Sequence, residues 1–192
     1  MILLITGSVR AGSETRAAVE ALAGVLQRRD VAFTHWDLRE RPLPIADPEY
    51  HERADVHPDA AVREIAALAR EAGAVVLATP VYHNSFSGVL KTCLDHLCIA
   101  DFAYKPVGLV AHGDNLSAVQ ACDQLRIVVR ALHGLALPVQ LVTTPDDFVR
   151  EDRGPRLAAE GVLRRLDRFA LDLLLYARLS EPVIRRARPK AG

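Results

Sequence analysis

The stretch that decides the fold lies at the start of the chain and reads Ile2-Leu3-Leu4-Ile5-Thr6-Gly7-Ser8-Val9-Arg10-Ala11-Gly12-Ser13-Glu14-Thr15-Arg16. Residues 2–6 are almost continuously apolar, which is typical of a strand buried on both faces, and the run ends at Gly7. From Ser13 to Arg29 the apolar residues recur at the spacing of one helix face. This stretch therefore predicts a buried strand, a loop and a helix.

The same alternation continues along the chain. Further strands are predicted at residues 31–38, 74–78, 106–111 and 137–142, further helices at residues 59–71, 88–98, 116–133 and 156–179, and loops at residues 39–58, 79–87 and 145–155. Strands that are apolar throughout and alternate with helices indicate a parallel sheet covered on both faces. The sequence thus predicts an α/β fold, a doubly wound five-stranded parallel sheet in the order 2-1-3-4-5.

The bulk properties indicate one domain, which we expect over residues 1–180, followed by a C-terminal tail over residues 181–192. The chain has 192 residues, and its 24 basic and 24 acidic side chains cancel, so no overall field favours nucleic acid or an anionic membrane. The first apolar run is too short for a signal peptide or a membrane span. We expect a cytoplasmic protein.

The cysteines and histidines carry no recognisable metal or disulfide pattern. Cys93, Cys98 and Cys122 include no Cys-x-x-Cys pair, and the histidines are scattered without metal-ligand spacing. Reduced, buried thiols and no metal site are therefore expected.

The first loop has the composition of a phosphate site. It leads directly into a helix N-terminus, where free N–H groups and the helix dipole favour an anion. Ser8, Ser13 and Thr15 can donate hydroxyl hydrogen bonds, and Arg10 can make a charge-assisted contact. An alternative is that Ser13 is merely the helix N-cap and Arg10 a solvated side chain. Neither a Gly-x-Gly-x-x-Gly nor a Walker pattern is present, so a mononucleotide phosphate fits best.

Doubly wound sheets bind ligands at the carboxyl ends of their strands, near the point where strand order reverses. This rule indicates three loops, at residues 7–15, 79–87 and 111–116. The second loop begins Thr79-Pro80-Val81-Tyr82-His83-Asn84-Ser85. Pro80 stiffens its turn and Tyr82 supplies a rigid aromatic wall, which suits a flat heterocycle.

Two motifs carry a family resemblance. Residues 7–13 read Gly-Ser-x-Arg-x-x-Ser, and residues 79–91 read Thr-Pro-x-Tyr-x-x-Ser-x-x-Gly-x-Leu-Lys. In these motifs the chain resembles the NADPH-dependent FMN reductase family of flavodoxin-like proteins, from Met1 to about Val142 in order and spacing. Within that family, the sequence of residues 81–92 is similar to that of the flavin reductases that supply two-component monooxygenases.

The resemblance implies FMN and NADPH (or NADH) as cofactors, a homodimer or homotetramer built partly through the helix after Gly88, and a monooxygenase as a further expected partner. Relatives often carry two adjacent glycines in the third loop, where this chain has His112-Gly113. The site residues that it implies are Ser8, Arg10, Ser13 and Thr15 for the FMN phosphate, and Pro80, Val81, Tyr82, His83, Asn84, Ser85, His112 and Gly113 around the isoalloxazine.

The function implied is an NAD(P)H-dependent FMN reductase, in which stacked cofactors exchange a hydride and no side-chain acid or base is obligatory. Asn84 or Ser85 is expected to stabilise negative charge on the reduced flavin, and His83 and His112 to make loop contacts without proton transfer. The nearest alternative holds FMN as a prosthetic group and reduces a quinone or azo compound. An alternative of another class is a flavodoxin-like electron carrier, although such carriers are strongly acidic.

The basic C-terminal residues leave two interpretations open. Arg185, Arg186, Arg188 and Lys190 either contact the extra phosphate of NADPH or form a solvated tail.

Overall fold

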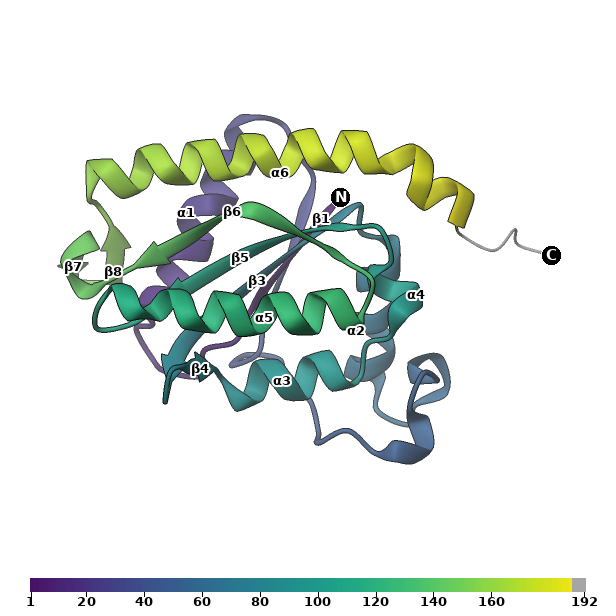
Figure 1. Ribbon diagram of the computed structural model, residues 1–192. Helices are drawn as coiled ribbons and strands as arrows, with labels where there is room; N and C mark the ends of the chain where they lie inside the picture. Colours follow the sequence, from purple (N-terminus) through teal and green to yellow (C-terminus); the bar gives the residue numbers. More distant parts are fainter. Residues whose placement is uncertain (188–192) are drawn as a thin grey trace.

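The computed structural model describes residues 1–187 and contains the predicted parallel sheet (Figure 1). Its order is β2-β1-β3-β5-β6, and every neighbouring pair on this path is parallel. Counted along the chain without the short β4, this is the predicted order 2-1-3-4-5. The strands are β1 (Ile2–Thr6), β2 (Phe33–Asp37), β3 (Ala74–Tyr82), β5 (Pro106–His112) and β6 (Leu135–Thr143).

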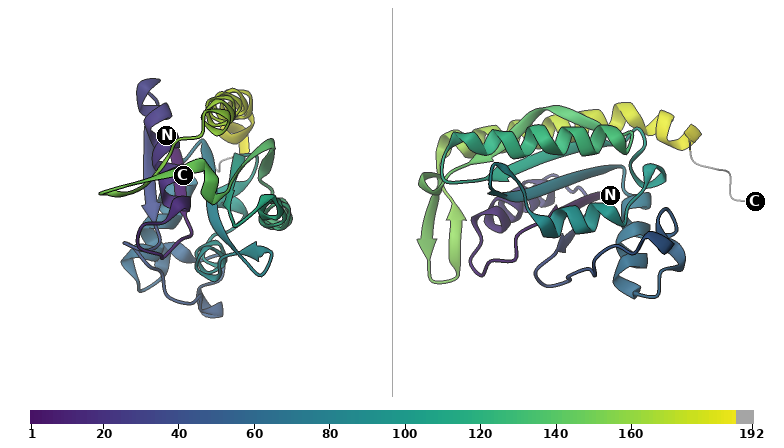
Figure 2. Two further views of the ribbon diagram at one scale, coloured as in Figure 1. Left: turned by 90° about the vertical axis from the view of Figure 1, so that its left-hand side faces the viewer. Right: turned by 60° about the horizontal axis from the view of Figure 1, so that its bottom comes forward.

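Helices cover both faces of the sheet (Figures 1 and 2). One hydrophobic core joins the sheet to α1 and α6, and the other joins it to α2, α3, α4 and α5. The helices are α1 (Glu14–Arg28), α2 (Ala60–Glu71), α3 (Gly88–Asp95), α4 (Ile99–Phe102), α5 (Val119–Ala131) and α6 (Glu160–Ala187).

The alternation of side chains explains why β1 is apolar throughout. Leu3 and Ile5 belong to one core, whereas Ile2 and Leu4 belong to the other, and all four are buried. A strand between two helix layers has no solvent-facing side, so both of its faces must be apolar. The position of β1 between β2 and β3 therefore places the loop after Thr6 between the ends of these two strands at the carboxyl edge.

The predicted turn at residues 79–87 is wrong in detail. β3 continues to Tyr82, and the chain then reverses through a two-residue turn into β4 (Ser85–Phe86), which pairs antiparallel with β3. β1 ends opposite Ala78, so the extension has no β1 neighbour and Pro80 removes no N–H from that pairing. A proline in a strand is therefore tolerated here.

The predicted charged loop at residues 145–155 also contains structure. A short turn η4 (Pro145–Asp147) precedes an antiparallel hairpin of β7 (Phe148–Glu151) and β8 (Gly154–Leu157). The helix predicted from residue 156 consequently begins at Glu160. It runs on to Ala187 rather than ending at residue 179. Ile184, which lies in the last turns beyond Pro182, is buried.

Two predicted helices and one predicted loop also differ in detail. The helix expected at residues 88–98 ends at Asp95 as α3, with the separate short helix α4 following it, and the helix expected at 116–133 opens with the 3-10 turn η3 (Leu116–Ala118). The proline-rich loop 39–58 holds two short 3-10 turns, η1 (Pro48–Tyr50) and η2 (Ala54–Val56), in place of a plain coil. Across residues 1–187, no helix combines the length and apolarity needed to cross a membrane.

Candidate functional site

The first two predicted loops are joined at the carboxyl edge of the sheet. The Gly7 N–H donates to the Ala78 carbonyl at 2.8 Å, and Ser87 Oγ donates to the Gly7 carbonyl at 2.6 Å. A Cβ on residue 7 would lie 2.7 Å from Leu90 Cβ, closer than carbon atoms approach. Gly7 is therefore required for the loop after β1 to pack against the start of α3.

The first loop combines a capped helix with an exposed arginine. Ser13 is the N-cap of α1, and its Oγ accepts from the Arg16 N–H at 3.2 Å, as the capping alternative predicted. Gly12 adopts a positive φ of 62°, which suits glycine. Arg10 extends into solvent, with its Nη1 3.8 Å from Glu14 Oε2. The cap uses one N–H of the first turn and the Arg10 guanidinium is exposed, so an anion can be contacted by both the helix N-terminus and Arg10.

Thr15 is the most informative residue of this loop. It is 1% exposed, and its Oγ1 has no hydrogen-bond partner within residues 1–187. A buried hydroxyl left unpaired costs about 1–3 kcal/mol, so such groups usually await a ligand or an ordered water. Ser8, at the start of the same loop, is also buried, with 4% exposure. An oxyanion in this loop would satisfy the Thr15 hydroxyl.

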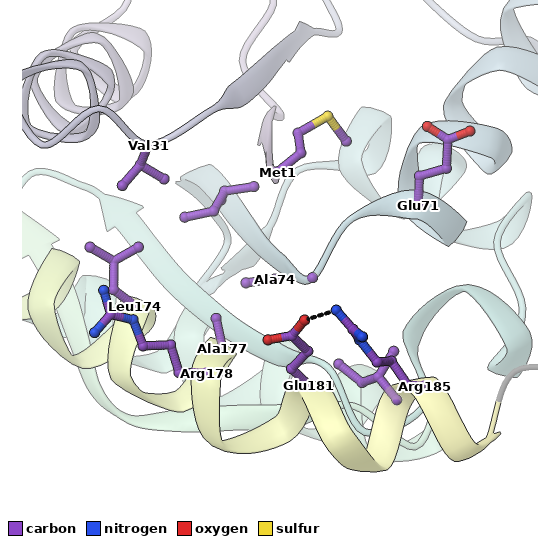
Figure 3. Close-up of a pocket in the computed structure, with 12 residues that line it drawn as sticks. Met1, Val31, Glu71, Ala74, Leu174, Ala177, Arg178, Glu181 and Arg185 are labelled. Carbon is purple, nitrogen blue, oxygen red and sulfur yellow. Dashed lines mark hydrogen bonds and ion pairs between the residues drawn. The ribbon is translucent and has the colours of Figure 1, made fainter.

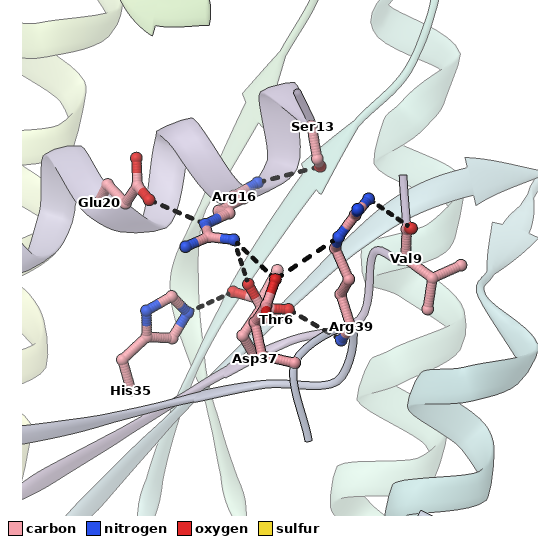
Figure 4. A network of polar contacts seen from close by, with 9 residues as sticks. Thr6, Val9, Ser13, Arg16, Glu20, His35, Asp37 and Arg39 are labelled. Atoms are coloured by element: carbon pink, nitrogen blue, oxygen red, sulfur yellow. Dashed lines mark hydrogen bonds and ion pairs between the residues drawn. The ribbon is translucent and has the colours of Figure 1, made fainter. Parts of the chain in front are cut away.

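A polar network fixes the start of α1 against β2 (Figure 4). Arg16 donates from Nε to Glu20 at 2.9 Å, and its Nη1 lies 3.2 Å from Asp37 Oδ2. The hydrogen bond to Glu20 raises the pKa of Arg16, and the carboxylates of Asp37 and Glu40 act in the same direction. Arg16 therefore stays charged, and it holds the first turn of α1 beside the end of β2.

Two further contacts complete that network. Thr6 Oγ1 lies 2.8 Å from His35 Nε2, and Arg39 Nη1 donates to the Val9 carbonyl at 3.2 Å (Figure 4). Burial lowers the pKa of His35, which favours its neutral form. The backbone of the first loop is thus held from the β2 side as well as from α3.

The second loop is a tight hairpin with a strained turn. His83 and Asn84 have φ values of 51° and 62°, and Tyr82 pairs with Ser85 across the turn. Two consecutive residues with positive φ are typical of a type I′ hairpin turn, for which asparagine is well suited. Pro80 is buried, Val81 is half-buried and Tyr82 is 49% exposed. The tyrosine ring thus remains accessible to a ligand.

Helix α5 anchors this hairpin. Ser85 Oγ donates to Gln124 Oε1 at 2.5 Å, and Gln124 Nε2 donates to the Asn84 carbonyl at 3.1 Å. These two hydrogen bonds restrict the conformation of the exposed two-residue turn. Gln124 was not predicted, because nothing in the sequence links it to a turn 40 residues earlier in the chain.

The third loop lies directly beside the second. His112 pairs in register with Pro80, and a Cβ on Gly113 would lie 3.3 Å from Val81 Cβ. His112 Nδ1 lies 3.1 Å from Thr143 Oγ1. Burial lowers the pKa of His112, and Arg10 adds to this effect while nearby carboxylates oppose it. His112 is therefore neutral near pH 7.

The structure thus brings the three predicted loops to one edge of the sheet. Sequence reasoning missed several residues that shape this edge, because each acts through a partner distant in the sequence. They are Glu14, Arg16, Ser87, Gln124, Phe148 and Arg150.

A separate cavity lies at the other end of the sheet (Figure 3). Its volume is about 460 Å³, and its lining includes Met1 and Val31, which precede β1 and β2, together with Glu181 and Arg185 of α6. The amino ends of the strands border it, whereas ligands of doubly wound sheets bind at the carboxyl ends. We do not assign it to the flavin. Within residues 1–187, no cluster of three metal-ligating side chains is present.

Comparisons with known proteins agree with this geometry. A sequence profile described as NADPH-dependent FMN reductase matches residues 1–147. An FMN-dependent NADPH-azoreductase of Staphylococcus saprophyticus is 34% identical over 173 residues, covering 90% of this chain and 92% of the relative. A Staphylococcus haemolyticus protein of the same name is 34% identical over 152 residues, covering 79% of this chain and 81% of that protein.

Solved structures show the same fold. The apo form of an NADH:FMN oxidoreductase matches with a TM-score of 0.68 and 29% identity, covering 90% of this chain and 89% of that one. A flavoenzyme NAD(P)H:(acceptor) oxidoreductase from Paracoccus denitrificans gives a TM-score of 0.75 at 15% identity, covering 93% and 97%, and shows the fold alone. Sequence motifs, sheet order and relatives agree: the chain belongs to the NADPH-dependent FMN reductase family and is an NAD(P)H-dependent oxidoreductase.

Proposed function

We propose that the chain binds FMN across the three loops at the carboxyl edge and reduces it with NADPH. The phosphate would be held by Ser8, Arg10, Ser13 and Thr15. The isoalloxazine would lie against the second and third loops, in contact with Pro80, Val81, Tyr82, His83, Asn84, Ser85, His112 and Gly113.

The unpartnered, buried Thr15 hydroxyl is the observation that carries this proposal. It lies in the first turn of α1, where the helix dipole also favours an anion. Gly12 permits the turn before it, and Arg10 is exposed at the same loop with a positive charge to offer. The donor set therefore fits a phosphate monoester.

The side chains around the ring have a positioning role. Bound FMN supplies the hydride chemistry, so the protein must orient the two rings and exclude competing reactions. Tyr82 offers an exposed aromatic surface, while Gln124 holds the Asn84 backbone in place. Asn84 or Ser85 would stabilise negative charge on the reduced ring. An unchanged rate of flavin reduction in Asn84→Ala would exclude a role for the Asn84 amide.

We further propose that the flavin stays bound and passes electrons to an azo or quinone acceptor in the same site. The support comes from the two staphylococcal relatives named as FMN-dependent NADPH-azoreductases, one of which matches over nine-tenths of this chain. Such acceptors are flat and conjugated, and the exposed Tyr82 ring suits stacking with them.

A second candidate function is a reductase that releases reduced FMN to a monooxygenase. It is favoured by the likeness to the NADH:FMN oxidoreductase, which at 29% identity spans most of both chains. The electron-carrier alternative has less support, because the matching family is one of reductases and the chain has no net charge. The distinction between the two reductase functions is whether FMN is a prosthetic group or a substrate.

Whether the purified protein retains FMN distinguishes these two reductase functions directly. Gel filtration in flavin-free buffer should give a yellow protein that oxidises NADPH with an azo dye or quinone and without added FMN. A colourless protein that oxidises NADPH only with excess FMN would favour the second candidate. A protein that neither binds FMN nor oxidises NADPH would refute both.

We also propose that the chain is a cytoplasmic homo-oligomer. An apolar recess of about 800 Å³ is lined by Leu94 of α3, by Leu97 just after this helix and by Ile127 of α5, and Ile127 is 59% exposed. These positions match the expectation of contacts through the helix after Gly88. The free cysteines suit a reducing compartment. Light scattering of the purified protein would give the number of subunits.

A further inference from the structure

The β7–β8 hairpin presents a defined inner face to the candidate site. Side chains two residues apart in a strand share a face, so Phe148 and Arg150 lie on the same side of β7. In register they oppose Leu157 and Pro155. Leu157 is buried in the core shared by α1 and α6, which fixes this side of the hairpin toward the protein.

Two contacts and one close approach link that face to the loops. A Cβ on Gly12 would lie 3.8 Å from Pro155 Cδ, the Phe148 and His112 rings meet edge to face with centroids 5.4 Å apart, and Arg150 Nη2 lies 3.5 Å from Glu14 Oε1. Figure 2 shows the hairpin at the end of the molecule where the purple loop after β1 lies. The hairpin therefore contacts both the first loop and the third.

Glu14 places a negative charge beside the proposed phosphate site, and Arg150 of the hairpin is paired with it. The Glu14 side chain is about 10% exposed and lies between Ser13 and Thr15, both assigned above to phosphate binding. A carboxylate there benefits from the helix dipole but repels a phosphate. Arg10 is within 3.8 Å of Glu14, so these two charges would cancel if they were alone. Arg150 restores one positive charge to the loop.

Stability does not account for the position of Arg150. Its side chain is 76% exposed, and ion pairs at such exposure contribute little to the stability of a folded protein. The hairpin also lies beyond residue 147, where the family profile ends. Neither the two family motifs nor the packing of the core therefore explains why an arginine occupies position 150.

We propose that Arg150 is a phosphate-positioning residue, which neutralises Glu14 and leaves Arg10 free to bind the phosphate of FMN. This inference rests on the proposed FMN site. Arg150 acts through Glu14, so its effect depends on the phosphate of the ligand and not on the ring.

The test compares FMN with riboflavin, which has the same ring and no phosphate. Dissociation constants would be measured by flavin fluorescence for the flavin-free wild type, Arg150→Ala, Arg153→Ala and the double variant Arg150→Ala/Glu14→Gln. We expect Arg150→Ala to weaken FMN binding by up to about 5-fold, the upper end for an exposed ion pair, and to leave riboflavin binding unchanged. The control Arg153→Ala, an exposed arginine in the turn of the same hairpin, should bind both flavins as the wild type does.

The double variant tests the role of Glu14. Removing the carboxylate removes the charge that Arg150 balances, so FMN affinity should return to within about 1.5-fold of the wild type. A double variant as weak as Arg150→Ala would overturn the inference, as would equal weakening of both flavins or no effect at all. A wild type that binds neither flavin would instead refute the proposed function itself.

Discussion

Ser87 donates a hydrogen bond from its Oγ to the carbonyl oxygen of Gly7 at 2.6 Å, across 80 residues of sequence. The same Oγ accepts from the Leu90 N–H at 3.3 Å as the N-cap of α3, and the Ser87 N–H donates to Thr79 Oγ1 at 2.9 Å. Ser87 therefore joins the first loop, β3 at Thr79 and the start of α3. The shape of the candidate site depends on this junction.

Replacing Ser87 by alanine should destabilise the protein. The change removes a helix cap and leaves the buried Gly7 carbonyl unpaired, so we expect a loss of about 1–3 kcal/mol in the free energy of unfolding. Urea denaturation followed by circular dichroism measures it. The matched control is Ser117→Ala, at an exposed serine, which should change stability by less than about 0.5 kcal/mol. Equal effects of the two variants would contradict the proposed junction.

Replacing Thr15 by valine should have opposite effects on stability and on ligand binding. Valine keeps the shape and removes the unpartnered hydroxyl, so the flavin-free protein should gain up to about 1 kcal/mol in the free energy of unfolding. FMN binding should weaken by about 10-fold, because a hydrogen bond to a charged phosphate is lost. Calorimetry of unfolding and of FMN binding measures both. Unchanged FMN affinity would remove Thr15 from the phosphate site.

Two half-buried histidines, His35 and His112, should make stability depend on pH. Burial lowers the pKa values of His112 and His35 in the folded state, so the unfolded chain binds protons more strongly. Their neutral forms give full stability above the unfolded value of about 6.5, and stability should fall as the pH drops below it. Urea midpoints of the flavin-free protein at several pH values would show this decline.

His112→Asn should make the loss of stability at low pH smaller without abolishing it, because His35 would still titrate. The control His51→Asn, at an exposed histidine, should leave the pH dependence unchanged. If stability rose on acidification through this range, the neutral state assigned to His35 and His112 would be wrong.

The cysteines should be slow to react. Burial raises the pKa of Cys93 to about 12 and that of Cys122 also to about 12, so neither forms a thiolate near pH 7. Cys98 is half-buried, and burial raises its pKa as well. A disulfide reagent that reports thiols by colour should therefore detect at most a slow reaction of one thiol, with all three reacting in denaturant. Rapid labelling of two thiols in the native protein would contradict the packing of α3 and α5.

The parallel sheet could be predicted from sequence because its strands are apolar on both faces. Residues 2–6 and 74–78 are readily identified as buried strands. The order of the strands in the sheet then determines where the loops that follow them lie. The first two loops were predicted for this reason. The extension of β3 to Tyr82 was not, because its pairing with Ser85 depends on a turn that uses His83 and Asn84 without glycine.

The hairpin β7–β8 was missed for a different reason. Its ten residues include several charges, and Leu157 is its buried apolar residue, so alternation is weak along the sequence. The contact of Arg150 with Glu14 joins residues far apart in the sequence and has no local pattern. Contacts of this kind follow from packing on the finished fold, which also explains why Gln124 was overlooked.

Anaerobic titration of the FMN-loaded protein with NADPH tests the central claim most directly. We predict that the visible absorbance of oxidised flavin disappears with one equivalent of NADPH per bound FMN, and that an azo or quinone acceptor restores it. The account would be contradicted by a protein that binds no FMN after refolding with excess flavin, or by bound FMN that stays oxidised in the presence of both NADPH and NADH.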